Sequence, residues 1–178
     1  STMREVSSII SEQTEKELMT KLAFMDIMTG LYNRNAYMCE VDKYRTGEIL
    51  ENTCMVLVDM NNLKGINDIL GHSVGDDALT MVGEILKNAF TGEVDAYRIG
   101  GDEFVLLLKN YNIEYVKFKM EKISDQVIEC SSEKKYNCSI AYGISTIESE
   151  NDYDIDEAYK KADKEMYVCK NKMKKDFT

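Results

Sequence analysis

The sequence predicts an α+β fold, an α/β sandwich in which helices pack on one central sheet. Segments with apolar residues at helical spacing are interleaved along the chain with short apolar or alternating runs that are typical of strands. Their order is helix, strand, helices, hairpin, helix, strand, helix, without an internal repeat or a low-complexity segment. With 178 residues and 44% hydrophobic content, the chain is large enough to bury one core.

The first half of the chain starts with a long polar helix. Residues 1–25 carry apolar side chains among many charges at imperfect helical spacing, which favours a linker or signalling helix that enters from an upstream domain; a freestanding cap is the alternative. A loop over residues 26–34 leads into a helix from about Asn35 to Leu50. The apolar run from Cys54 to Val58 is typical of a strand covered on both faces, and it ends at Asp59.

The region after this strand is expected to hold polar segments and a further helix. Residues 61–68 have helical potential, and residues 71–76 are expected to form a turn. Within that turn, Ser73 and Asp76 have the spacing of a capping box, so a helix is expected to follow. The sole histidine, His72, also lies in the turn, where we expect a structural hydrogen bond and no part in catalysis.

The last third predicts a helix, a strand and a helix. Apolar spacing indicates a helix over residues 113–127. Residues 136–147 alternate as a strand, in which Gly143 is expected to mark a bulge or a close approach of another element. Asp154 and Glu157 are expected to cap the last helix.

The central hairpin carries the residues with the clearest chemical potential. Strands are expected over residues 94–99 and 104–108. The tip between them holds two glycines and two carboxylates, Gly100, Gly101, Asp102 and Glu103. Glycine tolerates positive φ, which allows a tight turn, and lets a ligand approach the main chain, while adjacent carboxylates offer hard oxygen ligands to Mg²⁺. An ordinary turn with solvated acids is the alternative.

Asp59 supplies a second acidic strand end. If its strand neighbours the hairpin in one sheet, Asp59 and Asp102 converge on one metal site, the minimum for metal-assisted phosphoryl or nucleotidyl transfer. Lys170 and Lys174 lie one turn apart on the last helix, either as a solvated face or as phosphate contacts. Asp76 either favours a helix dipole or accepts hydrogen bonds from guanine.

Composition excludes several classes of function. The formal net charge of −10 argues against a nucleic-acid-binding protein, because that affinity comes from clustered Lys and Arg. A nucleotide can still bind where metal ions bridge it to carboxylates. Five scattered cysteines without Cys-x-x-Cys spacing favour a reducing, cytoplasmic setting. No run of about 20 apolar residues occurs, so we expect no membrane contact by this domain; membrane anchoring of a longer full-length protein stays open.

Four blocks of sequence have a recognisable order. The first, Asp26 to Arg34, reads Asp-x-Met-Thr-Gly-Leu-x-Asn-Arg, and the second runs from Asp59 to Asp76. The third is Arg98-x-Gly100-Gly101-Asp102-Glu103-Phe104, and the fourth is Ala162-Asp163-x-x-Met166-Tyr167-x-x-Lys170. Together they resemble the GGDEF domain family, the diguanylate cyclases, over the chain from Asp26 to about Lys174.

The resemblance implies a palm-like, ferredoxin-related fold with a mostly antiparallel sheet over residues 26–178. It implies an enzyme that condenses two GTP into cyclic di-GMP and two pyrophosphates, with Mg²⁺ or Mn²⁺ as cofactor. Each domain would hold one GTP, so an active homodimer is implied. An upstream sensory domain would control this pairing through residues 1–25.

Carried over by position, the resemblance also implies roles for single residues. The implied catalytic residues are Asp59, Asp102, Glu103 and Lys64. The implied metal ligands are Asp59, Asp102, Glu103 and the carbonyl of Met60. The implied substrate contacts are Leu63, Asn67 and Asp76 at the base and ribose, Lys64, Lys170 and Lys174 at the triphosphate, and Gly100 and Gly101 at the backbone approach.

The chain departs from the family pattern at three places. Asn61 replaces a second Asp, a variant also common in the family. Met173 and Lys174 replace a Gly-Arg pair, which keeps charge but loses a bidentate guanidinium, so lower phosphate affinity is expected. Residues 91–94 replace the Arg-x-x-Asp of the family's product-inhibition site, so feedback by cyclic di-GMP at that site is expected to be absent.

Two other functions stay open from the sequence. One is a catalytically inactive GTP-binding sensor or scaffold, which the intact set of acidic and glycine residues at 59 and 100–103 disfavours. The other is a nucleotidyl cyclase with a linear or mixed cyclic product, against which Asp76 at the base-reading position favours guanine in both sites.

Overall fold

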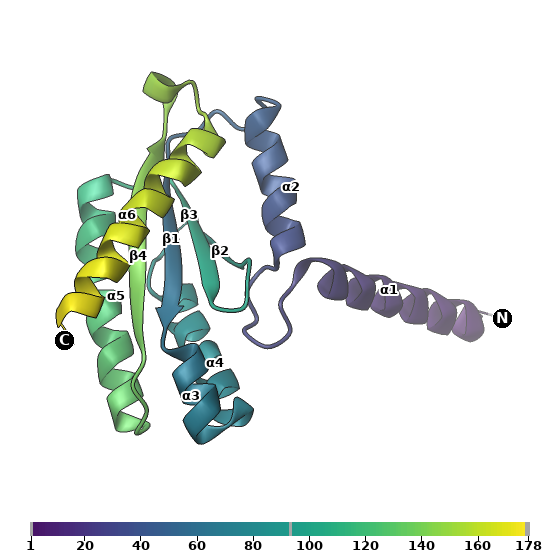
Figure 1. Ribbon diagram of the computed structural model, residues 1–178. Helices are drawn as coiled ribbons and strands as arrows, with labels where there is room; N and C mark the ends of the chain where they lie inside the picture. Colours follow the sequence, from purple (N-terminus) through teal and green to yellow (C-terminus); the bar gives the residue numbers. More distant parts are fainter. Residues whose placement is uncertain (1, 93, 177–178) are drawn as a thin grey trace.

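The computed structural model describes residues 2–92 and 94–176 and contains a four-stranded sheet covered by helices (Figure 1). The strands are β1 (Thr53–Asn61), β2 (Val94–Arg98), β3 (Glu103–Lys109) and β4 (Ser139–Ile147). They lie in the order β2-β3-β1-β4, and each neighbouring pair is antiparallel. This is the strand order of the ferredoxin-like βαββαβ arrangement, so the predicted α+β fold and the β2-β3 hairpin are confirmed.

Helices cover both faces of the sheet. They are α1 (Thr2–Phe24), α2 (Arg34–Arg45), α3 (Leu63–Leu70), α4 (His72–Asn88), α5 (Ile113–Glu133) and α6 (Ile155–Asp176). α2 and α6 pack on one face, and α4 and α5 pack on the other. Along β1, Val58 and Met60 belong to the α4–α5 core, whereas Met55 and Leu57 belong to the α2–α6 core. This alternation places Asp59 on the α6 side of the sheet.

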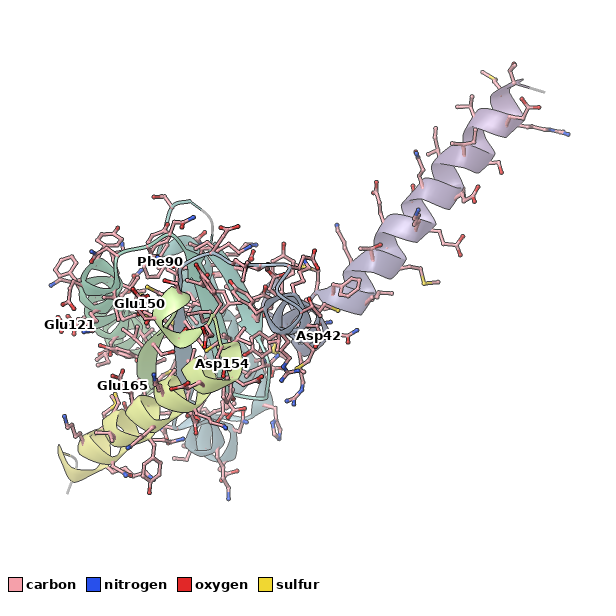
Figure 2. All side chains as sticks on the ribbon, turned by 90° about the horizontal axis from the view of Figure 1, so that it is seen from above. Asp42, Phe90, Glu121, Glu150, Asp154 and Glu165 are labelled. Atoms are coloured by element: carbon pink, nitrogen blue, oxygen red, sulfur yellow. The ribbon has the colours of Figure 1, made fainter. Side chains whose placement is uncertain are left out.

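α1 projects away from the domain (Figures 1 and 2). No described residue of α1 is buried, and Val6, Ile10 and Leu18 are each more than half exposed. The expected helix is therefore present, while the domain boundary at residue 25 stays a prediction. Ser1 and residues 177–178, at the two ends of the expected domains, lie outside the described residues. Among the described helices, none is long and apolar enough to cross a membrane.

α2 ends at Arg45, although the sequence predicted a helix to about Leu50. Gly47 adopts a φ of 74°, and the amide of Glu48 donates back to the carbonyl of Lys43 at 2.9 Å. A left-handed glycine of this kind closes the last turn of a helix. Ile49 and Leu50, which follow Gly47, continue the helical spacing of apolar residues in the sequence but lie outside the helix.

The predicted turn at residues 71–76 is wrong, because α4 begins at His72. Gly71, with a φ of 91°, makes the connection alone, and no side chain caps the helix, so Ser73 and Asp76 do not form a capping box. Gly75 is buried inside the first turns of α4, and a Cβ there would lie 1.8 Å from Oδ1 of Asn67. The second glycine therefore serves helix packing and not a turn.

The elements predicted near the end of the chain are present, but α5 runs on to Glu133, beyond the predicted residue 127, and β4 begins at Ser139 and not at residue 136. Gly143 is a close-approach site and not a bulge, since the β1–β4 register is continuous and a Cβ would lie 1.9 Å from the carbonyl oxygen of Ala162 in α6. Asp154, at the start of α6 (Figure 2), accepts hydrogen bonds from the amides of residues 156 and 157 at 3.0 Å. It caps the helix alone, because the side chain of Glu157 pairs with Lys161 at 3.0 Å.

Candidate active site

The candidate site lies at the end of the sheet where β1 ends and β3 begins. Asp59 is the register partner of Glu103, and the amide of Met60 donates to the carbonyl of Asp102 at 2.8 Å. The amide and carbonyl of one residue in an antiparallel strand point to the same side, so the Met60 carbonyl also faces the Asp102 loop. β1 continues two residues beyond Asp59 to Asn61, so the prediction that the strand ends at Asp59 is wrong. The segments that carry Asp59 and Asp102 are nevertheless neighbours, as the metal-site hypothesis requires.

Asp59 forms an ion pair across the sheet face with α6. Its Oδ1 accepts from Nζ of Lys170 at 2.8 Å. The Asp59 side chain is only 10% exposed, whereas that of Lys170 is 35% exposed. A nearly buried carboxylate is costly without a partner, and Lys170 supplies the compensating charge.

A pocket of about 570 Å³ opens beside this ion pair. Six predicted site residues line it: Met60, Leu63, Lys64, Asp102, Lys170 and Lys174. Three of these carry positive charge and one carries negative charge, so the pocket suits a ligand that presents several anionic oxygens. The chain as a whole has a net charge of −10, which makes this local excess of lysine a specific feature.

The start of α3 also faces this pocket. Asn62 adopts a left-handed φ of 68° and makes no side-chain cap, and its Nδ2 donates instead to the carbonyl of Asn137 at 2.8 Å. The first amides of α3 are thus left without a side-chain acceptor, on the pocket wall formed by residues 62–65. Gly65 permits this fold, because a Cβ there would lie 2.2 Å from Oδ1 of Asn62.

Glu103 and Asp102 line different pockets. It lines a second pocket of about 290 Å³ together with Arg34 and Tyr159, on the α2–α6 side of the sheet. A Cβ on Gly100 would lie 2.6 Å from Oε2 of Glu103, so the absence of a side chain at Gly100 allows the close approach of that carboxylate.

The glycines at the hairpin tip do not use left-handed backbone. Among the described glycines, positive φ occurs at Gly30, Gly47, Gly71 and Gly92. The expectation that positive φ at the tip makes this turn is therefore wrong. Gly101 has open space around its Cβ position, which leaves its backbone accessible.

The predicted base-reading residues lie at the junction of α3 and α4. Asn67 packs against Gly75, the residue that precedes Asp76. The structure therefore brings Asn67 and the start of α4 together, while neither Asn67 nor Asp76 lines the pocket beside Lys170.

The donor set at this edge fits a hard divalent cation. The carboxylates of Asp59 and Asp102 and the carbonyl of Met60 offer oxygen ligands, and the ammonium of Lys170 at Asp59 shows that the position attracts positive charge. Within residues 2–92 and 94–176, no group of three or more His, Cys, Asp or Glu side chains is arranged to hold a metal. A cation here would thus be held by two carboxylates and a backbone carbonyl, and substrate phosphates would complete its coordination, which is the usual manner of Mg²⁺.

Several residues of this site were not found from the sequence. Asn137 and Ser139 line the pocket, and Nδ2 of Asn61 donates to Oγ of Ser139 at 3.0 Å. Polar residues at the start of a strand have no pattern that distinguishes them from ordinary solvated positions, so only the tertiary structure identifies them. In the stretch that departs from the product-inhibition motif, Glu93 lies outside the described residues, and the expected absence of feedback stays a prediction.

Comparison with known proteins gives a consistent family. A family model described as diguanylate cyclase, GGDEF domain, matches residues 23–176. The chain is 34% identical over 148 residues to the probable diguanylate cyclase DgcJ of Escherichia coli K12, which covers 82% of this chain and 29% of that protein. It is 29% identical over 154 residues to diguanylate cyclase DgcS of Shewanella oneidensis, with 85% and 51% covered. The chain thus spans about a third to a half of these curated relatives.

Solved structures share the fold. The coiled coil and GGDEF domain of DgcB from Caulobacter crescentus, in complex with c-di-GMP, has a TM-score of 0.77 at 20% identity and covers 94% of this chain and 91% of that one. A microbial GGDEF domain solved with cyclic di-GMP has a TM-score of 0.70 at 25% identity and covers 86% and 94%.

Proposed function

The chain belongs to the GGDEF domain family of diguanylate cyclases, and from this premise we propose that it condenses two molecules of GTP into cyclic di-GMP with release of two pyrophosphates. The observation that carries the proposal is the pocket that Asp102 shares with three lysines, one of which, Lys170, pairs with Asp59 on the neighbouring strand. A site with carboxylates for a cation and ammonium groups for phosphates suits nucleotidyl transfer.

The proposed metal ligands are Asp59, Asp102 and the carbonyl of Met60, with Glu103 in support. When bound, Mg²⁺ would activate the ribose 3′-OH and stabilise the charge that develops at the α-phosphate. Asp59 and Glu103 are direct cross-strand partners, and like charges in such positions repel. A cation at this edge therefore also relieves a repulsion that the sheet itself imposes.

The proposed triphosphate contacts are Lys64, Lys170 and Lys174. Lys64 extends from the first turn of α3, whose free amides line the same pocket. Amides at a helix start carry partial positive charge and bind phosphate oxygens well. Lysine contributes charge without the two-pronged geometry of arginine, which agrees with a lower phosphate affinity than a Gly-Arg ending would give.

Guanine would be read at the junction of α3 and α4. A carboxylate at Asp76 suits the amine and ring N–H donors of guanine, and the amide of Asn67 suits its acceptors. Leu63, which is half-buried between the pocket and the α4–α5 core, would pack against the base and ribose.

Two copies of the domain would be needed for turnover. Each pocket would hold one GTP, and attack on an α-phosphate by the 3′-OH of the second nucleotide requires two sites face to face. The exposed apolar residues of α1 support pairing through this helix, under the control of an upstream sensory domain. DgcB, the relative with a TM-score of 0.77, was solved with a coiled coil attached to its GGDEF domain.

The proposal is tested by incubating concentrated protein with GTP and Mg²⁺ and identifying products by mass spectrometry, beside an Asp102→Ala variant. Cyclic di-GMP from the parent chain alone is the expected result. Metal-dependent GTP binding without product at any protein concentration would show that the protein is a GTP-binding sensor and not an enzyme. A linear or mixed dinucleotide product would replace it by a different nucleotidyl transferase.

A further inference from the structure

We propose that Lys170 is an internal counter-ion of Asp59, which competes with the divalent cation for this carboxylate and passes to the nucleotide triphosphate when the cation binds. The inference rests on the proposed function, and it assigns to one residue two alternating partners. It predicts that metal and nucleotide bind cooperatively to a single domain.

Lys170 occupies the position at Asp59 that a metal ion would take. Its Nζ lies 2.8 Å from Oδ1 of Asp59, on the α6 side of the sheet where the alternation of β1 directs that carboxylate. Asp59 is 10% exposed at its side chain, so solvent screens this pair less than it screens a surface pair. A cation that coordinates Asp59 must therefore displace an ammonium group already bound there.

Asp59 also faces a second negative charge. Its cross-strand partner is Glu103, and two carboxylates in directly opposed positions of one sheet destabilise each other. Lys170 offsets this repulsion in the absence of a metal ion. A divalent cation would take over that role with twice the charge, which releases the lysine without leaving the carboxylates uncompensated.

Lys170 has a second position available in the proposed triphosphate pocket. Lys170 lines the pocket shared with Lys64, Lys174 and the start of α3, where the triphosphate is proposed to bind. Its side chain is 35% exposed and rests on a flexible four-carbon stem, so reorientation needs no movement of α6. If the nucleotide draws Lys170 away from Asp59, metal affinity rises, and by linkage the metal raises nucleotide affinity by the same factor.

The test is a Mn²⁺ titration of the nucleotide-free protein, with free Mn²⁺ measured by electron paramagnetic resonance. We expect Lys170→Met to bind Mn²⁺ about tenfold more tightly than the parent chain, because the competing charge is gone. Lys170→Gln, which keeps a hydrogen-bond donor without charge, should behave similarly. Lys170→Arg keeps the competing charge and should bind Mn²⁺ like the parent.

A matched control separates local competition from the net charge of the protein. Lys172 lies two residues further along α6 and lines a different pocket, so Lys172→Met removes the same charge away from Asp59. It should change the affinity for Mn²⁺ less than about twofold, because screening weakens interactions between distant exposed charges. Circular dichroism of each variant verifies that the fold is retained.

The Mn²⁺ affinities of these variants either support or overturn the role of Lys170 as a counter-ion. Tighter binding in both neutral variants at position 170, and not in Lys172→Met, supports the counter-ion. Equal or weaker binding in those variants than in the parent overturns it, including the case in which none of the proteins binds Mn²⁺. Production of cyclic di-GMP is measured separately on the parent chain, so the inference can fail while the proposed function stands.

Discussion

The guanidinium of Arg98 lies 3.3 Å from both carboxylate oxygens of Asp26. The same side chain donates to the carbonyl of Gly101 at 2.8 Å through its other terminal nitrogen. Asp26 also accepts hydrogen bonds from the amide and the hydroxyl of Thr29. The loop that follows α1 is thereby tied to the hairpin tip, one residue before Asp102.

Removing the charge of Asp26 should loosen this connection. Asp26→Asn keeps the shape of the side chain but weakens the charge-assisted hydrogen bonds from Thr29 and Arg98, so we expect a loss of about 1–2 kcal/mol in the free energy of unfolding. Urea denaturation measures the loss. In the control variant Asp42→Asn, the lost partner is Arg45 in an exposed pair at 3.5 Å, and the change should stay below about 0.5 kcal/mol. Equal losses in the two variants would contradict the prediction.

The stabilising contribution of the Asp26 carboxylate should depend on pH. Burial raises the pKa of Asp26, but hydrogen bonds from Thr29 and the charge of Arg98 outweigh it, so the pKa lies below its ordinary value. A lowered pKa in the folded state means that the contribution to stability is complete above about pH 4 and is lost as the pH falls through the folded-state value. We therefore expect the difference in unfolding free energy between the parent and Asp26→Asn to shrink below pH 4. A difference that stays constant or grows toward acid would show that the charge is not what stabilises the loop.

Packing of α6 against the sheet depends on Gly143. A methyl group at this position would lie 1.9 Å from a backbone oxygen of Ala162, which no rotamer change relieves. Gly143→Ala should therefore destabilise the domain by about 2–3 kcal/mol, the upper range for overpacking. Gly101→Ala is the matched control, since a Cβ there meets nothing within 4 Å. Thermal unfolding compares the two, and a similar shift in both variants would be inconsistent with the close approach.

Elements whose signal lies in consecutive residues could be predicted from the sequence, whereas features that depend on packing between distant residues could not. The apolar run before Asp59 predicted β1 and the acidic tip at Asp102 predicted the hairpin, because burial on both faces and a short acidic turn are visible in consecutive residues. The end of β1 was missed by two residues, because Met60 and Asn61 still pair with β4. The turn expected around His72 failed, because Gly75 is a packing glycine whose partner, Asn67, lies on another helix. The ion pair between Lys170 and Asp59 joins residues 111 positions apart, and no spacing rule reaches that far.

The proposed recognition of guanine by Asp76 predicts a preference for GTP over inosine triphosphate. Inosine triphosphate lacks the exocyclic amine of GTP, so a carboxylate that accepts from this amine should prefer GTP by about tenfold or more, the range for a hydrogen bond to a charged group. Asp76→Asn should bring the ratio of kcat/KM for GTP to that for inosine triphosphate close to one, mainly by lowering kcat/KM for GTP. Asp77→Asn is the control, because it removes the adjacent carboxylate of α4, which pairs with Lys134 at 2.9 Å. It should leave the preference intact. A variant at position 76 that still discriminates against inosine triphosphate would place the guanine contact on another residue.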